Sequence, residues 1–275
     1  MAALIDEEYL QRALGKNFYR ETISVKERRH ILFATDDQLT LLSRAKTWYL
    51  DGTFNVVRAP FKQMLSVHAF IRAGDCMKQI PLCFVLMSGK KRKDYKKVLS
   101  AILQHLPSIE VKSFVVDYEA GLWQAIRDVF PQPDIQGCAF HFGQALYRKT
   151  AYNERCNVYA LLRKTFALPL LPVEDIRPVF DTLRTKSDTD ATDRYFDYPE
   201  RTWMTNPLWP IDSCCVFGRS IRTNNDCEGW HHRLNRRAKK GNLPFCLLLQ
   251  LLCKEAKLLN TQVRLVRGKV EETSE

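Results

Sequence analysis

The segment Ile80–Met87 constrains the fold more than any other part of the chain, because it reads Ile-Pro-Leu-Cys-Phe-Val-Leu-Met without a charged residue. A short, continuous apolar run of this kind is typical of a β-strand that is buried on both faces. Two strand-like segments precede it: Thr47–Val57 is rich in aromatic and β-branched residues, and Gln63–Arg72 alternates apolar and polar residues. Three successive strands with short connections predict an antiparallel meander.

Helices and further strands are predicted after the meander, from the change between helical and strand-like spacing of the apolar residues. In order, these are a helix over Tyr95–Leu106, a strand over Lys112–Asp117, a helix over Ala120–Phe130 and a fifth strand over Ile135–Phe142. The order β-β-β-α-β-α-β implies an α/β fold in which helices flank a mixed sheet.

The 275 residues divide into four predicted parts. A charged N-terminal segment with only a weak helical period is linker-like, and the first part of the α/β core follows it. A mainly helical insertion, punctuated by prolines, separates this core from a helical C-terminal part. The predicted bounds are residues 1–45, 46–142, 143–215 and 216–275.

A basic excess points to a polyanionic partner. The chain has 42 Lys and Arg against 31 Asp and Glu, a formal net charge of +11, and a pI near 9.2. Such a charge favours nucleic acid as the partner, although it says nothing about the fold. Nine cysteines, an odd number without a Cys-x-x-Cys pair, indicate a reducing compartment. With no signal-peptide pattern and no apolar run long enough to span a bilayer, we expect a soluble intracellular protein.

Two aspartates are candidates for chemistry. Asp51 lies inside an aromatic strand, where a carboxylate is disfavoured, although an ordinary Asp-Gly turn with Gly52 is the alternative. Asp117 ends an apolar strand and precedes a helix, at the edge where α/β sheets place ligands. A helix N-cap explains Asp117 equally well.

Glu228 is the third candidate. Asn225 and Glu228 together resemble a capping box, which accounts for their spacing but not for the neighbouring Trp230, His231 and His232. If the strands of the two aspartates are neighbours, these aspartates and a glutamate on a later helix can converge on one site. Phosphodiester chemistry uses such carboxylates to hold two Mg²⁺ ions about 3.5–4 Å apart.

Five blocks of sequence, spread from about Leu42 to Glu255, point to a known family. The blocks are Trp48–Phe54, Val116–Ala120, Gly137–Phe142, Ala167–Pro172 and Thr223–His231. Together and in this order they resemble the Mutator-like element (MULE) transposases, which belong to the DDE superfamily and have an RNase H-like fold. The resemblance implies that Asp51, Asp117 and Glu228 are catalytic and hold two Mg²⁺ or Mn²⁺ ions. It also implies a helical insertion before Glu228.

Cys138 and His141 match the Cys-x-x-His element of the family, and one interpretation of the pair is that it helps to orient the catalytic region together with His231. In a regular strand, residues i and i+3 point to opposite faces, so both can face one ligand only if the strand turns. Four zinc ligands of recognised spacing cannot be assembled around this pair, so zinc is not expected. A buried cysteine beside a hydrogen-bonded histidine is the favoured alternative.

Two basic runs are candidates for DNA contact. The run at residues 90–97 is explained equally well as a solvated face. The second run follows Glu228 on the same predicted helix, so we expect it to bind DNA phosphates. Its members, at the helical spacing i, i+3, i+4, i+7, are Arg233, Arg236, Arg237 and Lys240.

The leading hypothesis is a transposase catalytic domain that performs metal-dependent DNA cleavage and strand transfer in the nucleus. The alternatives are a transposase-derived, inactive DNA-binding or scaffold protein and, less favoured, a hydrolase with paired carboxylates such as a glycosidase. No cysteine precedes Cys76, so we do not expect these residues to form the N-terminal Cys/His finger usual in such transposases. The expected partners are DNA, further copies of this chain, and a separate DNA-binding protein in place of the finger.

Overall fold

The computed structural model describes residues 7–14, 17–73, 76–149, 157–223, 225–238 and 243–272. Its centre is a seven-stranded mixed sheet with the strand order β1-β2-β5-β4-β3-β6-β7. The strands are β1 (Tyr19–Val25), β2 (Arg28–Phe33), β3 (Thr47–Thr53), β4 (Gln63–Ala73), β5 (Cys76–Met87), β6 (Ser113–Val116) and β7 (Asp134–Gly137). The predicted meander is present as antiparallel β3, β4 and β5, whereas β3, β6 and β7 are parallel. The predicted α/β class, with a mixed, helix-flanked sheet consistent with an RNase H-like fold, is confirmed.

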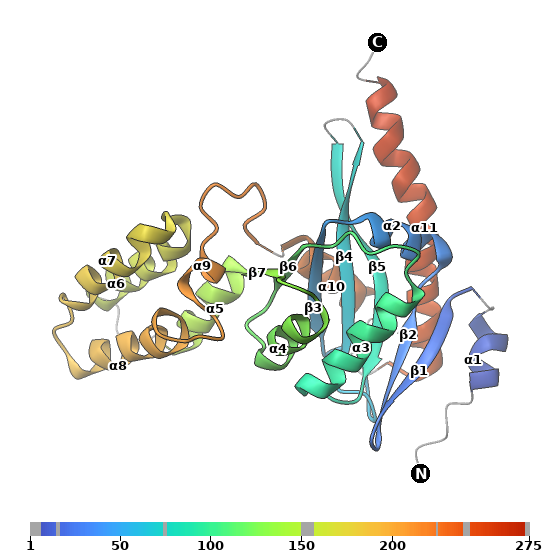
Figure 1. The fold of residues 1–275 in the computed structure, drawn as a ribbon, viewed down its shortest axis with the longest axis horizontal. Helices are drawn as coiled ribbons and strands as arrows, with labels where there is room; N and C mark the ends of the chain where they lie inside the picture. Colours follow the sequence, from blue (N-terminus) through green and yellow to red (C-terminus); the bar gives the residue numbers. More distant parts are fainter. Residues whose placement is uncertain are drawn as a thin grey trace.

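Helices cover both faces of this sheet (Figure 1). On one face lie α3 (Arg92–His105) and α4 (Ala120–Val129), and on the other lie α10 (Asn225–Arg237) and α11 (Phe245–Glu272). Alternate residues of β5 enter the two cores, because Val85 packs on the α3 side and Phe84 on the α10 side. All residues from Leu82 to Met87 are 0% exposed. Burial on both faces explains why this segment lacks polar alternation.

The segment 1–45 differs from the predicted linker. Where it is described, it forms α1 (Glu7–Leu14), β1, β2 and α2 (Asp36–Arg44), and β2 pairs with β5 to extend the main sheet. The strand β1 is one edge of the sheet and carries only three buried apolar residues among polar ones, namely Tyr19, Ile23 and Val25. An edge strand needs little apolar alternation, and this is why its pattern in the sequence is weak.

The predicted fifth strand over Ile135–Phe142 is also different. The strand β7 ends at Gly137, and α5 (Ala139–Lys149) begins two residues later. A Cβ atom at Gly137 would overlap the ring of Tyr118, so this close approach requires glycine. The chain therefore leaves the sheet at Cys138 and continues as a helix.

A helical subdomain with its own core follows and stands beside the β7 edge of the sheet (Figure 1). Its helices are α5, α6 (Asn157–Phe166), α7 (Val173–Arg184), α8 (Asp190–Pro199) and the short α9 (Ile211–Cys214). The ring of Tyr118 joins it to the sheet, because this ring stacks on Trp123 of α4 and meets the edges of Trp203 and Trp209. In the part of the chain described, no helix is both long and apolar enough to cross a lipid bilayer.

Candidate active site

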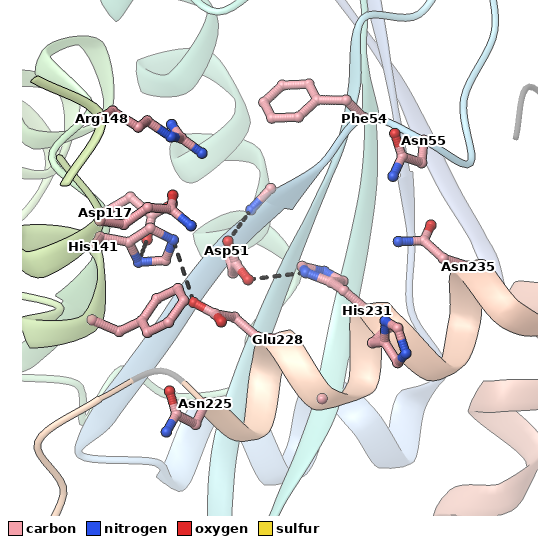
Figure 2. Close-up of a pocket in the computed structure, with 15 residues that line it drawn as sticks. Asp51, Phe54, Asn55, Asp117, His141, Arg148, Asn225, Glu228, His231 and Asn235 are labelled. Carbon is pink, nitrogen blue, oxygen red and sulfur yellow. Dashed lines mark hydrogen bonds and ion pairs between the residues drawn. The ribbon is translucent and has the colours of Figure 1, made fainter. Parts of the chain in front are cut away.

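A cavity of about 940 Å³ opens where β3 and β6 end, between α5 and α10 (Figure 2). It brings together residues that lie far apart in the sequence. Those of the predicted site that line it are Asp51, Asp117, His141, Glu228 and His231.

The register of the parallel strands explains why two of the carboxylates meet. Leu50 of β3 pairs with Val116 of β6, and Val116 pairs with Gly137 of β7. The residues that directly follow these three paired positions are Asp51, Asp117 and Cys138. They therefore form one row across the carboxyl ends of the parallel strands, which is where α/β sheets bind ligands.

Asp51 lies inside β3, opposite Ser66 of β4, and is only 5% exposed. Its Oδ1 accepts a hydrogen bond of 2.8 Å from the backbone N–H of Gly52, and its Oδ2 lies 2.9 Å from Nδ1 of His231. The alternative of an Asp-Gly turn does not describe this residue. A buried carboxylate is costly unless it is paired, and His231 is the paired group here.

On the side away from Asp51, the ring of His231 belongs to a chain of hydrogen-bonded side chains. Nε2 of His231 and Nε2 of His68 each lie 2.9 Å from Oγ of Ser66, and all three side chains are buried. Burial, together with the neighbouring His231 and Arg233, lowers the pKa of His68 well below 6.5. The chain fixes the ring of His231 toward Asp51, as groups behind a ligand do in metal sites.

Acid is expected to destabilise the fold through His68. Because the folded pKa of His68 is lowered, the unfolded chain takes up a proton first as pH falls through 6.5, and stability then declines down to the folded pKa. One such group contributes up to about 1.4 kcal/mol per pH unit in this window. Denaturant unfolding above and below pH 6.5 measures this change in stability.

His68→Gln should flatten the dependence of the unfolding free energy on pH. A smaller dependence should remain from His30, because burial also lowers the pKa of that residue. An unchanged slope in His68→Gln, matching the control His105→Gln, would contradict the assignment.

His141 lies between Asp117 and Glu228. Its Nδ1 is 2.7 Å from Oδ1 of Asp117, and its Nε2 is 3.4 Å from Oε1 of Glu228 (Figure 2). The N-cap of α4 is Glu119 rather than Asp117, and the carboxylate of Glu228 is turned toward the cavity. The N-cap alternative for Asp117 is therefore wrong.

Several carboxyl groups lie close together in the cavity, and this shifts their pKa values. Burial raises the pKa of Asp117, and the nearby charge of Asp51 adds to the effect. Burial likewise raises the pKa of Glu228, with repulsion from Asp51 and Asp117. Burial alone would lower the pKa of His141, but its contacts with Asp117 and Cys138 raise it to about 11. At neutral pH the proton of the Asp117–His141 pair therefore resides on the ring, which partly compensates the acids.

Cys138 and His141 share one side of the strand-to-helix junction. A regular strand would point them to opposite faces, but the strand ends at Gly137 and helical spacing of i and i+3 brings them together. A sulfur of Cys138, a ring nitrogen of His141 and a carboxylate oxygen of Glu228 all lie within 4.8 Å of one another. The chain therefore turns at this point, as it must if both residues are to face one ligand.

Several residues of the cavity were not predicted. From α5, Phe140, Gln144 and Arg148 line it, and from the end of β3 the exposed Phe54 does so. Three of the α5 residues, His141, Gln144 and Arg148, have the helical spacing i, i+3, i+7. This helical spacing would have predicted these cavity residues if the segment had been assigned to a helix and not to a strand.

The residues of the predicted basic stripe on α10 have different environments in the structure. Arg233 and Arg237 both bind the carboxylate of Glu255 on α11, which is 3% exposed and also accepts a hydrogen bond from Nε1 of Trp230. Both arginines therefore hold the two helices together. Arg236 is exposed, and it lies one helical turn beyond His232, which lines the cavity. Lys240 lies outside the described residues.

The first basic run is only partly a solvated face. Nζ of Lys90 lies 3.4 Å from Oε2 of Glu119 and 4.5 Å from the centre of the Phe54 ring, at the rim of the cavity. Arg92 forms a bidentate ion pair with Asp128. Lys90 thus adds a positive charge next to an exposed aromatic ring.

Residues 47–145 match the family model of the MULE transposase domain. The matched stretch runs from β3 into α5, so it includes the row of Asp51, Asp117 and Cys138 and also His141. The resemblance inferred from the sequence is confirmed for this stretch. A MULE transposase domain implies a transposase-related function, DNA as a partner and, in general, dependence on a divalent metal. A search of curated proteins gives no match to this chain.

Proposed function

We propose that this protein is the catalytic domain of a DDE-type transposase, in which Asp51, Asp117 and Glu228 hold two Mg²⁺ or Mn²⁺ ions that act on DNA. The observation that carries the proposal is the convergence of these carboxylates on one cavity, two from neighbouring parallel strands within the stretch that matches the MULE transposase domain and one from α10, beyond that stretch. Action on chromosomal DNA would place the protein in the nucleus.

The donor set fits a hard divalent cation. Oε1 of Glu228 is buried and forms no hydrogen bond with any described residue, and the buried Oδ1 of Asp117 makes a 2.7 Å contact with His141, so both carboxylates have acceptor capacity left. Burial and mutual repulsion raise the pKa values of both acids, which is an unfavourable arrangement in the absence of a cation. Oxygen ligands of this kind are those that Mg²⁺ and Mn²⁺ prefer.

The proposed reaction is two in-line displacements at phosphorus. In the first, a water oxygen attacks the phosphorus, the bond to the 3′ oxygen breaks, and that oxygen takes up a proton to become a 3′-hydroxyl. In the second, this hydroxyl attacks a phosphodiester of target DNA, and the displaced 3′ oxygen leaves as a hydroxyl. When bound, a pair of divalent cations activates the attacking oxygen and stabilises the leaving one.

The rim of the cavity supports DNA as the substrate. Arg148, Lys90 and Arg236 supply positive charge for phosphates, while Phe54 and Phe140 are 52% and 42% exposed and line the cavity. Exposed aromatic rings next to cations are suited to stacking on unpaired bases. Arg236 replaces the full predicted stripe as our candidate for phosphate contact on α10.

Nicking of supercoiled plasmid tests the proposed function. At low salt, non-specific backbone affinity supports binding without recognition of specific ends, so the full chain should nick plasmid when Mg²⁺ or Mn²⁺ is added. Asp51→Asn should lose this activity and still bind plasmid. Plasmid binding without any metal-dependent nicking would instead favour the inactive DNA-binding protein.

Phe54→Ala is expected to weaken binding of single-stranded DNA by about 1–3 kcal/mol, because one stacked base contributes about that much. Fluorescence anisotropy with a labelled oligonucleotide measures the change. Phe217 offers a matched control, since it is 57% exposed and is not among the residues that line the cavity. Equal losses in Phe54→Ala and Phe217→Ala would show that the cavity rim has no special part in binding.

A further inference from the structure

Beyond the three carboxylates, we propose that Cys138, His141 and Glu228 form a second metal site that takes a borderline cation such as Zn²⁺. Sequence spacing offers only the first two of these ligands, because Glu228 is far along the chain. The fold supplies the third from α10, with one donor atom of each residue within 4.8 Å of the others.

The distances are close to those of a tetrahedral ion. Bond lengths of about 2.0–2.3 Å place two ligands of one tetrahedral zinc ion about 3.3–3.8 Å apart. Nε2 of His141 and Oε1 of Glu228 are already 3.4 Å apart, and Oε1 makes no hydrogen bond to any described residue. The Cys138 sulfur, within 4.8 Å of a donor atom of each of the other two residues, supplies the third ligand, and sites with three protein ligands keep a fourth position for water.

The surroundings of His141 fit the same assignment. A metal-binding histidine almost always donates its second ring N–H to a carboxylate or a carbonyl, which fixes the orientation of the ring. Here Nδ1 of His141 lies 2.7 Å from Oδ1 of Asp117, while Nε2 faces Glu228. Asp117 is thus the positioning group for this site, and it remains an oxygen ligand in the proposed Mg²⁺ site.

The two proposed sites differ in the kind of ligand atoms that they offer, and therefore in the cations that they prefer. Thiolate and imidazole donors select Zn²⁺ or Co²⁺, whereas carboxylates alone select Mg²⁺ or Mn²⁺. Both sites use Glu228, so occupation by Zn²⁺ withdraws this carboxylate and inhibits Mg²⁺-dependent cleavage. This inhibitory consequence rests on the proposed function, but binding of Zn²⁺ does not.

Titration of the full chain with Co²⁺ as a spectroscopic probe tests the site. We expect visible absorption of a tetrahedral ion together with a near-ultraviolet sulfur-to-cobalt charge-transfer band, both reversed by added Zn²⁺. Cys138→Ala should remove that band and weaken Co²⁺ binding by at least about 100-fold, since loss of an outer-shell partner alone costs about 10–100-fold. The proposal is overturned if the wild-type chain gives no such band, or if the band persists in Cys138→Ala.

Matched variants distinguish this result from damage to the fold. Cys227→Ala should keep the band, because Cys227 is also buried and instead donates to Oε1 of Gln79. Asp51→Asn, which removes a proposed Mg²⁺ ligand, should keep the band too, whereas His141→Gln should alter the visible spectrum and retain the sulfur contribution. Absence of plasmid nicking with the band present counts against the proposed function alone, and nicking without the band counts against the zinc site alone.

Discussion

Asp117→Asn is expected to reduce metal-dependent nicking by more than about 100-fold while plasmid binding changes little. Loss of a single hydrogen-bond donor at a transition state costs about 10²–10³ in kcat, and a carboxylate that holds a catalytic cation contributes at least as much. The amide keeps the size of the side chain, so the row across β3, β6 and β7 should persist. Initial rates of nicking and plasmid retardation on gels, measured on the same preparations, separate catalysis from binding.

The neighbouring acid provides the control. Glu119 is two residues away, is partly buried and pairs with Lys90 at 3.4 Å, but it is not among the residues that line the cavity. Glu119→Gln should therefore nick plasmid at a rate within a few-fold of the wild type. If Asp117→Asn still cuts, Asp117 is not a metal ligand. An equal loss in Glu119→Gln would mean that the effect of Asp117→Asn is not specific to the proposed site.

Glu255→Ala is expected to destabilise the protein by about 2–3 kcal/mol. The variant leaves the buried N–H of Trp230 without its acceptor, which alone costs about 1–3 kcal/mol. Arg233 and Arg237 lose their partner as well, but their side chains are 45% exposed, so water screens most of that loss. Urea unfolding followed by circular dichroism measures the difference.

Lys254 lies next to Glu255 on α11 and is exposed, so Lys254→Ala should stay within about 0.5 kcal/mol of the wild type. Arg236→Ala, on the exposed side of α10, should leave stability similarly unchanged. A destabilisation of Glu255→Ala no larger than that of these controls would mean that α10 and α11 do not depend on this carboxylate.

The regular parts of the fold could be predicted because their patterns are local. Ile80–Met87 has no polar residue since both of its faces are buried, and the spacing after Asp94 is that of α3. The edge strand β1 and the change from strand to helix at Cys138 were missed for the opposite reason. An edge strand needs little apolar alternation, and the end of β7 lies against the side chain of Tyr118, a contact between residues distant in the sequence that requires glycine at 137.

The residues of the candidate site could be predicted from the sequence because of the family resemblance, and not because of the spacing between them. The position of Asp51 next to Asp117 depends on the parallel register of β3 and β6, which local patterns do not encode. Arg233 and Arg237 show the same limit, because their helical spacing does not reveal that Glu255 binds both. Whether a charged side chain meets solvent or a buried partner is decided by tertiary packing.

The aromatic junction around Tyr118 also gives the protein a built-in optical reporter. Three of the five tryptophans, Trp123, Trp203 and Trp209, surround this ring, where the helical subdomain meets the sheet beside Asp117. The remaining two, Trp48 and Trp230, are buried in the cores on the two faces of the sheet. Intrinsic fluorescence is therefore weighted toward this boundary, and any shift of the subdomain against the sheet when DNA binds would alter the emission without an attached dye.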